Sequence, residues 1–177
     1  GGTETGRHVM SAAGKNLVPC TMELGGKSAN IILSSADLER ALDGALLGIF
    51  SNNGQQCLAG SRILLERSIY EDFIEKFVER TKKIKVGDPL DNSTEIGPLA
   101  SKEDMKRVLT FAETARKEGG TILVGGDRRN DLGEGYFINP TAVKVLSNNT
   151  KVTQQEIFGP FASFIIFDTI QEAIEIA

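Results

Sequence analysis

The sequence predicts an α/β fold built around a mostly parallel sheet, and three observations lead to this prediction. Short apolar runs of strand length alternate along the chain with amphipathic stretches of helical length, which is the pattern of βαβ units. The chain has 177 residues, of which 40% are hydrophobic, and this suffices for a domain with a sizeable core. No segment is repeated, and none is of low complexity.

The first strand and helix are predicted between residues 28 and 54. Residues 28–33, SANIIL, have the length and apolar character of a strand. Ser35 is placed to cap the helix that follows. One face of this helix would be buried, because apolar residues recur on it at helical spacing: Leu38, Leu42, Ala45, Leu46 and Ile49. Residues 52–54, Asn-Asn-Gly, tolerate the left-handed conformation and predict the end of the helix.

A second strand and helix follow directly. Residues 63–65, Ile-Leu-Leu, predict a strand, and residues 68–84 predict an amphipathic helix. The inner face of this helix carries the larger apolar side chains Tyr70, Phe73, Ile74, Phe77 and Val78. Residues 87–98, GDPLDNSTEIGP, are dense in turn-forming residues and predict a polar loop.

The third helix is predicted to begin after Ser101, which can cap it. Asp104 falls in its first turn, where a negative charge favours the helix dipole. Its inner face carries Met105, Val108, Leu109, Ala112 and Ala115. Two glycines at 119–120 would end it.

The last part of the chain supplies further strands. Residues 121–124, TILV, and residues 162–167, ASFIIF, each predict a strand, and the intervening residues 137–146 predict an extended segment. Gly125-Gly126 opens a loop, and residues 170–177 begin a final helix.

Composition excludes several classes of protein. The formal net charge is -4 with a pI near 5.2, and without a stripe of Lys and Arg we expect no nucleic-acid partner. No apolar run reaches the roughly 18 residues of a membrane span, so we expect no membrane partner. Two isolated cysteines do not form a disulfide framework, which favours a reducing, cytoplasmic location. Because the only histidine is His8 and no Cys-x-x-Cys pair exists, we expect no metal.

Two glycine-containing segments are weak candidates for phosphate binding. Residues 24–28, LGGKS, are similar to the tail of a P-loop, but a P-loop requires Gly where Thr21 stands. Residues 1–6, GGTETG, place Gly2 and Gly6 where the backbone could approach an anion. A plain turn is the simpler interpretation of the second segment.

Cys57 stands behind a polar run, Asn-Asn-Gly-Gln-Gln, where a helical pattern stops. A thiol with a pKa of about 8.5 is only slightly ionised at neutral pH and needs a base or dipole to act as a nucleophile. His8 lies in a poor context for a Cys–His dyad. Glu23, 34 residues before Cys57 (57 − 23), is the alternative base. A half-buried packing thiol and a solvated carboxylate remain the simpler interpretations of these two residues, and Cys20 is expected to be a packing or surface thiol.

Four segments in order raise the significance of this pair: GGTETG, MELGGKSAN, NNGQQCLAGSR and QQEIFGPFASF. Together they resemble the signature blocks of the NAD(P)-dependent aldehyde dehydrogenase family, with Glu23 in the glutamate block and Cys57 in the cysteine block. The segments VGDPLD, IGPLAS and GYFINPT are similar to the family's connecting segments. The resemblance covers essentially the whole chain. It implies a three-layer αβα catalytic domain at residues 24–177, truncated at its C-terminus, and a tail of a Rossmann-like cofactor domain at residues 1–22.

The resemblance also implies a mechanism. The Cys57 thiolate would attack the aldehyde carbon, a hydride would pass to NAD or NADP, and Glu23 would activate the water that hydrolyses the thioester. The Cys57 N–H would supply half of an oxyanion hole, while the family's other donor, an Asn side chain, would lie upstream of Gly1. The implied cofactor contacts are Gly1, Gly2, Gly6, Leu24, Glu156 and Phe158, of which Glu156 would bind the nicotinamide ribose and Phe158 would pack near the nicotinamide.

The sequence departs from the family's pattern at two positions and leaves two other functions open. Gly2 stands where many members carry Ser, and Gln155 stands where many carry Glu. CoA-acylating semialdehyde oxidation is the first alternative, although that branch usually lacks the glutamate base that Glu23 would provide. A non-catalytic scaffold with the same fold is the second.

The substrate and the assembly follow from the resemblance alone. Residues 45–73 look most like the branch that handles 5-carboxymethyl-2-hydroxymuconate semialdehyde, so the expected partner is a small-molecule aldehyde. The chain begins without Met and ends inside a helical pattern, so we expect an internal segment of a longer protein, which would form a homodimer or homotetramer. We expect the isolated segment to bind NAD poorly and to turn over little or no aldehyde.

Overall fold

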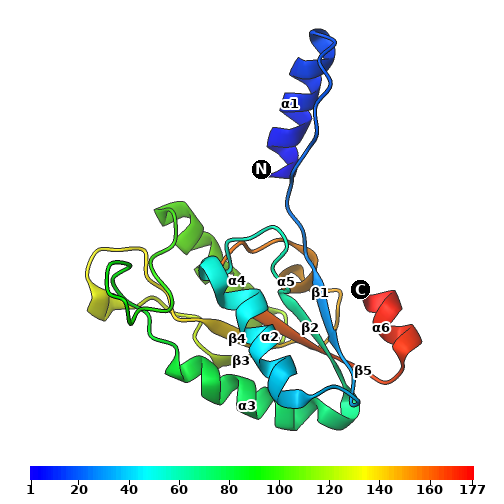
Figure 1. Ribbon diagram of the computed structural model, residues 1–177, viewed down its shortest axis with the longest axis vertical. Coiled ribbons are helices and arrows are strands. Elements are labelled where there is room, and N and C mark those ends of the chain that lie inside the picture. The colour runs from blue at the N-terminus through cyan, green and yellow to red at the C-terminus, as the bar shows by residue number, and fades with distance from the viewer.

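A five-stranded sheet forms the centre of the chain. The structure is a computed structural model that describes residues 1–177 (Figure 1). The strand order is β1-β2-β5-β4-β3, and all neighbours are parallel except the edge pair β3–β4, which is antiparallel. The strands are β1 (Ala29–Ile32), β2 (Arg62–Glu66), β3 (Thr121–Val124), β4 (Thr141–Lys144) and β5 (Phe161–Phe167). The predicted mostly parallel sheet is therefore confirmed.

Helices cover both faces of the sheet and produce three layers. The helices are α1 (Thr3–Lys15), α2 (Leu38–Phe50), α3 (Tyr70–Lys83), α4 (Lys102–Lys117), α5 (Lys151–Gln154) and α6 (Ile170–Ile176). One apolar cluster joins α2 and α3 to the sheet, and a second joins α4, α5 and α6 to the opposite face (Figure 1). Side chains of β5 alternate between the two clusters, as the two-residue period of a strand requires.

The core on the α2–α3 face is aromatic at its centre. Phe77 of α3 is fully buried and contacts Phe50 and Phe73 as well as Phe164 of β5, with ring centroids 5.0 Å apart in the last pair. The Phe77–Phe164 pair is edge-to-face, a favourable arrangement for two aromatic rings. This packing fixes α3 on the sheet and, through Phe50, fixes the C-terminal end of α2.

Two local predictions need correction. Ser35 does not cap α2: the cap is Asp37, whose carboxylate accepts hydrogen bonds from the N–H groups of Glu39 and Arg40. A carboxylate at that position satisfies the first free N–H groups of the helix, so Ser35 lies in the turn over residues 33–36 and the helix begins only after Asp37. Within the extended segment predicted at 137–146, only Thr141–Lys144 forms a strand, β4. The short helix α5 was not predicted.

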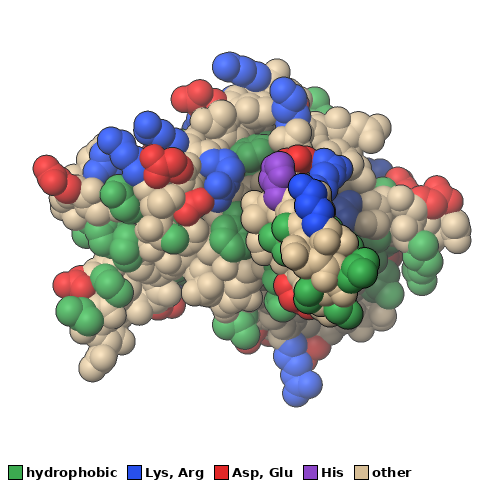
Figure 2. Space-filling view, turned by 90° about the horizontal axis from the view of Figure 1, so that it is seen from above, with side chains coloured by type: hydrophobic (Ala, Val, Ile, Leu, Met, Phe, Trp, Pro, Cys, Tyr) green, Lys and Arg blue, Asp and Glu red, His purple; other side chains and the backbone are tan.

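The first 22 residues extend away from the sheet. Helix α1 begins at Thr3 with Gly2 at the N-cap position, so the expected turn over residues 1–6 is instead the start of a helix (Figure 1). The view from above looks toward this part of the molecule and shows acidic and basic side chains interspersed around the purple His8 (Figure 2). Cys20 is exposed, and its Sγ lies 3.2 Å from Sδ of Met10.

Candidate active site

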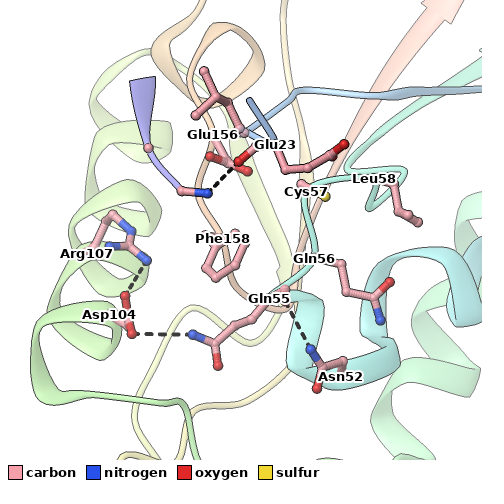
Figure 3. A pocket seen from close by; sticks show the side chains of 14 residues that line it. Glu23, Asn52, Gln55, Gln56, Cys57, Leu58, Asp104, Arg107, Glu156 and Phe158 are labelled. Carbon is pink, nitrogen blue, oxygen red and sulfur yellow. Dashed lines mark hydrogen bonds and ion pairs between the residues drawn. The ribbon is translucent and has the colours of Figure 1, made fainter. Parts of the chain in front are cut away.

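Segments far apart in the sequence meet at a cavity of about 770 Å³ (Figure 3). It lies where the start of the chain, the segment before β1, the loop after α2, the start of α4 and the segment before β5 come together. Its lining residues are Gly1, Gly2, Glu23, Leu24, Gly25, Asn52, Gln55, Gln56, Cys57, Leu58, Asp104, Arg107, Glu156 and Phe158. Both residues of the candidate catalytic pair are among them.

Left-handed residues shape the loop that carries Cys57. Asn52, Asn53 and Gly54 have φ values of 49°, 59° and 66°, so three successive residues turn the chain sharply after α2. Asn and Gly are the residues that adopt this conformation most readily, which confirms the predicted end of the helix at residues 52–54. The Asn53 amide then holds the loop in place, because it donates to the Pro98 carbonyl at 2.8 Å and accepts from the Gly97 N–H at 3.1 Å.

Gln55 anchors the same loop to the start of α4. Its Oε1 accepts from the Ala100 N–H at 3.1 Å, and its Nε2 donates to Asp104 at 3.4 Å. The Gln55 carbonyl accepts from the Asn52 side chain at 3.0 Å. Through these contacts the polar residues ahead of Cys57 anchor the loop.

Cys57 itself is free of such contacts. Its thiol is unpaired and exposed, and no group in the chain accepts a hydrogen bond from its backbone N–H. Glu23 is also exposed, and its backbone carbonyl accepts from the N-terminal amine of Gly1 at 2.7 Å. Figure 3 shows Glu23 and Cys57 beside one another on the cavity wall. Folding thus brings to one cavity the two residues that the sequence separates by 34 positions (57 − 23).

Glu156 and Phe158 enter the cavity from the segment before β5. The Glu156 carboxylate accepts from the Gly26 N–H at 3.3 Å, which directs it toward the segment that follows Glu23 and Leu24. Phe158 has φ 57°, a conformation that is rare for a bulky residue, and the residue remains 36% exposed. Backbone strain of this kind is found where a side chain is held in place for function.

Of the remaining candidate cofactor residues, Gly1, Gly2 and Leu24 line the cavity, and Gly6 does not. Gly6 lies inside α1, buried against the Leu24 side chain. It therefore supports the position of Leu24 and is not exposed to the cavity itself.

Asp104 and Arg107 are cavity residues that sequence reasoning missed. Arg107 donates to Asp104 at 2.5 Å and, through Nε, to the Ile157 carbonyl at 2.9 Å. The Asp104 carboxylate also accepts a hydrogen bond from the Ser101 hydroxyl at 2.8 Å. The pair thus links the Cys57 loop to the Phe158 segment through the start of α4. A charged pair three residues apart is common on any helix surface, so the spacing alone carried no signal.

Lys27 is a second unanticipated feature, immediately behind the cavity. Its Nζ is buried without a hydrogen-bond partner, while its carbonyl accepts from Nε of the buried Arg62 at 2.9 Å. Burial lowers the pKa of Lys27, the Arg62 charge lowers it further, and the Glu156 charge raises it; together they bring the pKa to about 7. From the sequence, Lys27 was notable only as part of the P-loop-like segment at residues 24–28.

Two other properties of the structure concern metals and membranes. No group of three or more His, Cys, Asp or Glu side chains is arranged to hold a metal ion. None of the helices combines the length and the hydropathy that a membrane crossing requires.

Comparison with known proteins gives relatives along the whole chain. The model of the aldehyde dehydrogenase family matches residues 1–177. The chain is 45% identical over 182 aligned residues to 5-carboxymethyl-2-hydroxymuconate semialdehyde dehydrogenase of Escherichia coli, and 40% identical over 176 to betaine aldehyde dehydrogenase of Brucella anthropi. These alignments cover 100% and 98% of the chain but only 38% and 36% of the relatives, so the chain spans little more than a third of their length.

Solved structures agree with the sequence comparison. An aldehyde dehydrogenase of Bacillus cereus in complex with NAD+ superposes with a TM-score of 0.95 at 41% identity, over 99% of this chain and 35% of the other. A betaine aldehyde dehydrogenase of Staphylococcus aureus in complex with NAD+ superposes with a TM-score of 0.95 at 43% identity, again over 99% of this chain and 35% of the other. With a family model matched from end to end and a fold shared at this level, the chain belongs to the aldehyde dehydrogenase family.

Proposed function

We propose that the protein containing this chain oxidises an aldehyde to a carboxylic acid with NAD or NADP as the hydride acceptor. The observation that carries the proposal is the meeting of Glu23 and Cys57 at one cavity, which Glu156 and Phe158 also line. Both solved relatives described above are complexes with NAD+. We further propose that residues 1–22 belong to the cofactor domain and residues 24–177 to the catalytic domain.

The residues of the cavity suit a dinucleotide. A carboxylate such as Glu156 can accept hydrogen bonds from both hydroxyls of a ribose. The Phe158 ring offers an apolar surface of the size of a nicotinamide, and the backbone at Gly1, Gly2 and Leu24 borders the same space. When bound, the nicotinamide accepts the hydride from the substrate carbon. The task of these side chains is to orient that ring toward Cys57.

Cys57 is the proposed nucleophile. Its thiolate attacks the carbonyl carbon, the C=O bond becomes a C–O⁻ bond, and the product is a thiohemiacetal on Sγ. The Cys57 N–H has no other acceptor in the chain and is available to the oxyanion, a donor that contributes about 3 kcal/mol in other acyl-transfer enzymes. Loss of hydride from that carbon re-forms the C=O bond and leaves a thioester on Cys57.

Glu23 is the proposed base for the second half of the reaction. Its carboxylate takes a proton from a water molecule, the water oxygen attacks the thioester carbon, and the C–S bond breaks to release the carboxylic acid. The exposed position of Glu23 beside Cys57 gives water access to the acyl group. This assignment favours hydrolysis over transfer to CoA, which would need a second thiol in place of an activated water.

The proposal is tested with the full-length protein that carries residues 1–177. We expect NAD(P)-dependent aldehyde oxidation without added CoA, abolished by Cys57→Ala. An absolute requirement for CoA would establish the acylating alternative. If no oxidation occurs and Cys57 is alkylated by iodoacetamide no faster than Cys20 near neutral pH, the scaffold alternative is correct.

For the substrate we propose the semialdehyde class of the Escherichia coli relative, which has 45% identity to the chain, against 40% for the Brucella enzyme. The two names describe substrates of opposite charge, a carboxylate-bearing semialdehyde and a quaternary ammonium aldehyde. A panel containing both, each assayed with NAD and with NADP, decides between them through the ratio of kcat/KM values. A preference for betaine aldehyde would reject the semialdehyde assignment. The assembly is proposed to be a homodimer or homotetramer, which sedimentation of the full-length protein tests.

A further inference from the structure

Two adjacent glycines stand between the groups that the proposed mechanism uses. Gly25 and Gly26 connect Leu24 to Lys27, and Gly25 borders the cavity. A Cβ atom added to Gly25 would lie 2.6 Å from Cδ of Glu156 and closer still to Oε2. A Cβ atom added to Gly26 would lie 2.8 Å from the carbonyl oxygen of Cys57. Both distances are below 3.0 Å, a separation that real Cβ atoms essentially never show.

Space alone explains why these positions are occupied by glycine. Neither Gly25 nor Gly26 has a positive φ, so alanine would accept the same backbone conformation. The neighbouring atoms differ in kind. Gly25 faces the end of a flexible side chain, whereas Gly26 faces the backbone of the residue that bears the thiol. An added methyl group at Gly25 therefore displaces a carboxylate, and one at Gly26 displaces a peptide unit of the Cys57 loop.

That loop has little freedom to retreat. Asn53 holds it by two hydrogen bonds to the backbone at residues 97 and 98, and Gln55 holds it by two more to Ala100 and Asp104. The Gly26 N–H also donates to Glu156 Oε1 at 3.3 Å, so the same two residues that leave room for the carboxylate also hold it by a hydrogen bond.

We propose that Gly25 and Gly26 are positioning residues with separate tasks: Gly25 sets the place of the Glu156 carboxylate, and Gly26 sets the place of the Cys57 peptide. The inference rests on the proposed function, in which Glu156 orients the cofactor and Cys57 attacks the aldehyde. A displacement of about 1 Å at a reacting group can lower a rate by about 100-fold, so a single methyl group is a sufficient perturbation.

The test uses Gly25→Ala and Gly26→Ala in the full-length protein, with Gly44→Ala as the matched control. Gly44 lies in α2, and a Cβ added there meets no atom within 4 Å. The two readouts are NAD affinity by fluorescence titration and the iodoacetamide alkylation rate of Cys57 by peptide mass spectrometry. Cys20 in the same digest is the internal reference.

The two variants should fail in different ways. Gly25→Ala should weaken NAD binding by about 10-fold or more and leave the alkylation rate of Cys57 within about twofold of the parent. Gly26→Ala should slow the alkylation of Cys57 by about 10-fold and leave that of Cys20 unchanged. Gly44→Ala should change neither quantity. Unchanged Cys57 alkylation in Gly26→Ala would overturn the task assigned to Gly26.

A double-variant cycle separates spacing from general damage to the fold. In the Glu156→Ala background the atoms that the new methyl group would meet are gone, so Gly25→Ala should lower neither the thermal unfolding midpoint nor NAD affinity any further. An equal loss of unfolding midpoint in both backgrounds would overturn the task assigned to Gly25. The alkylation rates and the unfolding midpoints need no turnover, so they test the two glycines even if the protein oxidises no aldehyde.

Discussion

Replacing Lys27 by Met should stabilise the protein at neutral and acidic pH. Burial and the positive charge of Arg62 lower the pKa of the Lys27 ammonium, and the negative charge of Glu156 only partly offsets them, so the pKa falls from 10.5 to about 7. A cationic group whose pKa is lower in the folded state makes the charged form costly to fold. The Nζ atom also has no hydrogen-bond partner that would offset the free-energy cost of its burial.

The size and pH dependence follow from the two pKa values. Below about pH 7 the amine is protonated in both states, and the difference between 10.5 and about 7 corresponds to about 5 kcal/mol at 1.36 kcal/mol per pH unit. Between about pH 7 and pH 10.5 the unfolded chain still binds a proton that the folded chain has released, so the stability of the parent protein rises with pH. The advantage of Lys27→Met should therefore be about 5 kcal/mol at acidic pH and nearly lost by about pH 10.5.

Urea unfolding at about pH 6 and about pH 10 measures this advantage. Lys82→Met is the control, because Lys82 is exposed on α3 and makes no ion pair, so that change should stay within about 0.5 kcal/mol at either pH. An advantage of Lys27→Met that is equal at the two pH values, or a loss of stability at pH 6, would refute the reasoning.

Other substitutions test the loop, the core and the segment as a whole. Gly54→Ala forces a left-handed alanine whose Cβ would lie 2.5 Å from the Gly159 carbonyl carbon, so urea unfolding should show a loss of about 2–4 kcal/mol; no loss would mean that the two loops are not in contact. Phe77→Ala should lower the unfolding free energy by about 3–5 kcal/mol, because the ring is fully buried between three others; a change below about 1 kcal/mol would contradict the packing. Asn53→Ala removes both bonds to residues 97–98 and should cost about 1–3 kcal/mol while slowing Cys57 alkylation, and a parental alkylation rate would remove the anchoring role. The isolated 177-residue chain should show little NAD-dependent turnover, and ordinary activity would contradict that expectation.

The regular elements could be predicted because each has a local cause. The apolar positions of α2, α3 and α4 recur at helical spacing, and Ser101 caps α4 as expected, accepting from the Asp104 N–H at 3.1 Å. The prediction that Ser35 caps α2 was wrong because Ser35 and Asp37 are both good capping residues. Which of them caps the helix depends on the path of the chain after β1. Helix α5 is only one turn long, too short for a periodic pattern.

The candidate site was predictable only through resemblance. Taken as isolated residues, Glu23 and Cys57 gave a weak signal, because nothing in their spacing says that the segment before β1 and the left-handed loop at Asn52–Gly54 bring them to one cavity. The position of the Asp104–Arg107 pair at the cavity and the burial of the Lys27 amine depend on tertiary contacts. Burial by other segments determines both features, and a linear pattern does not contain that information.

The central claim is that Glu23 and Cys57 act in sequence on one acyl group. The direct measurement is a rapid-quench experiment on full-length Glu23→Gln with aldehyde and NAD, followed by mass spectrometry of the Cys57 peptide. The claim predicts a burst of about one equivalent of NADH per site and an acyl adduct that persists on Cys57, because the thioester forms but is not hydrolysed. Turnover at the parental rate, or the absence of any adduct on Cys57, would contradict it.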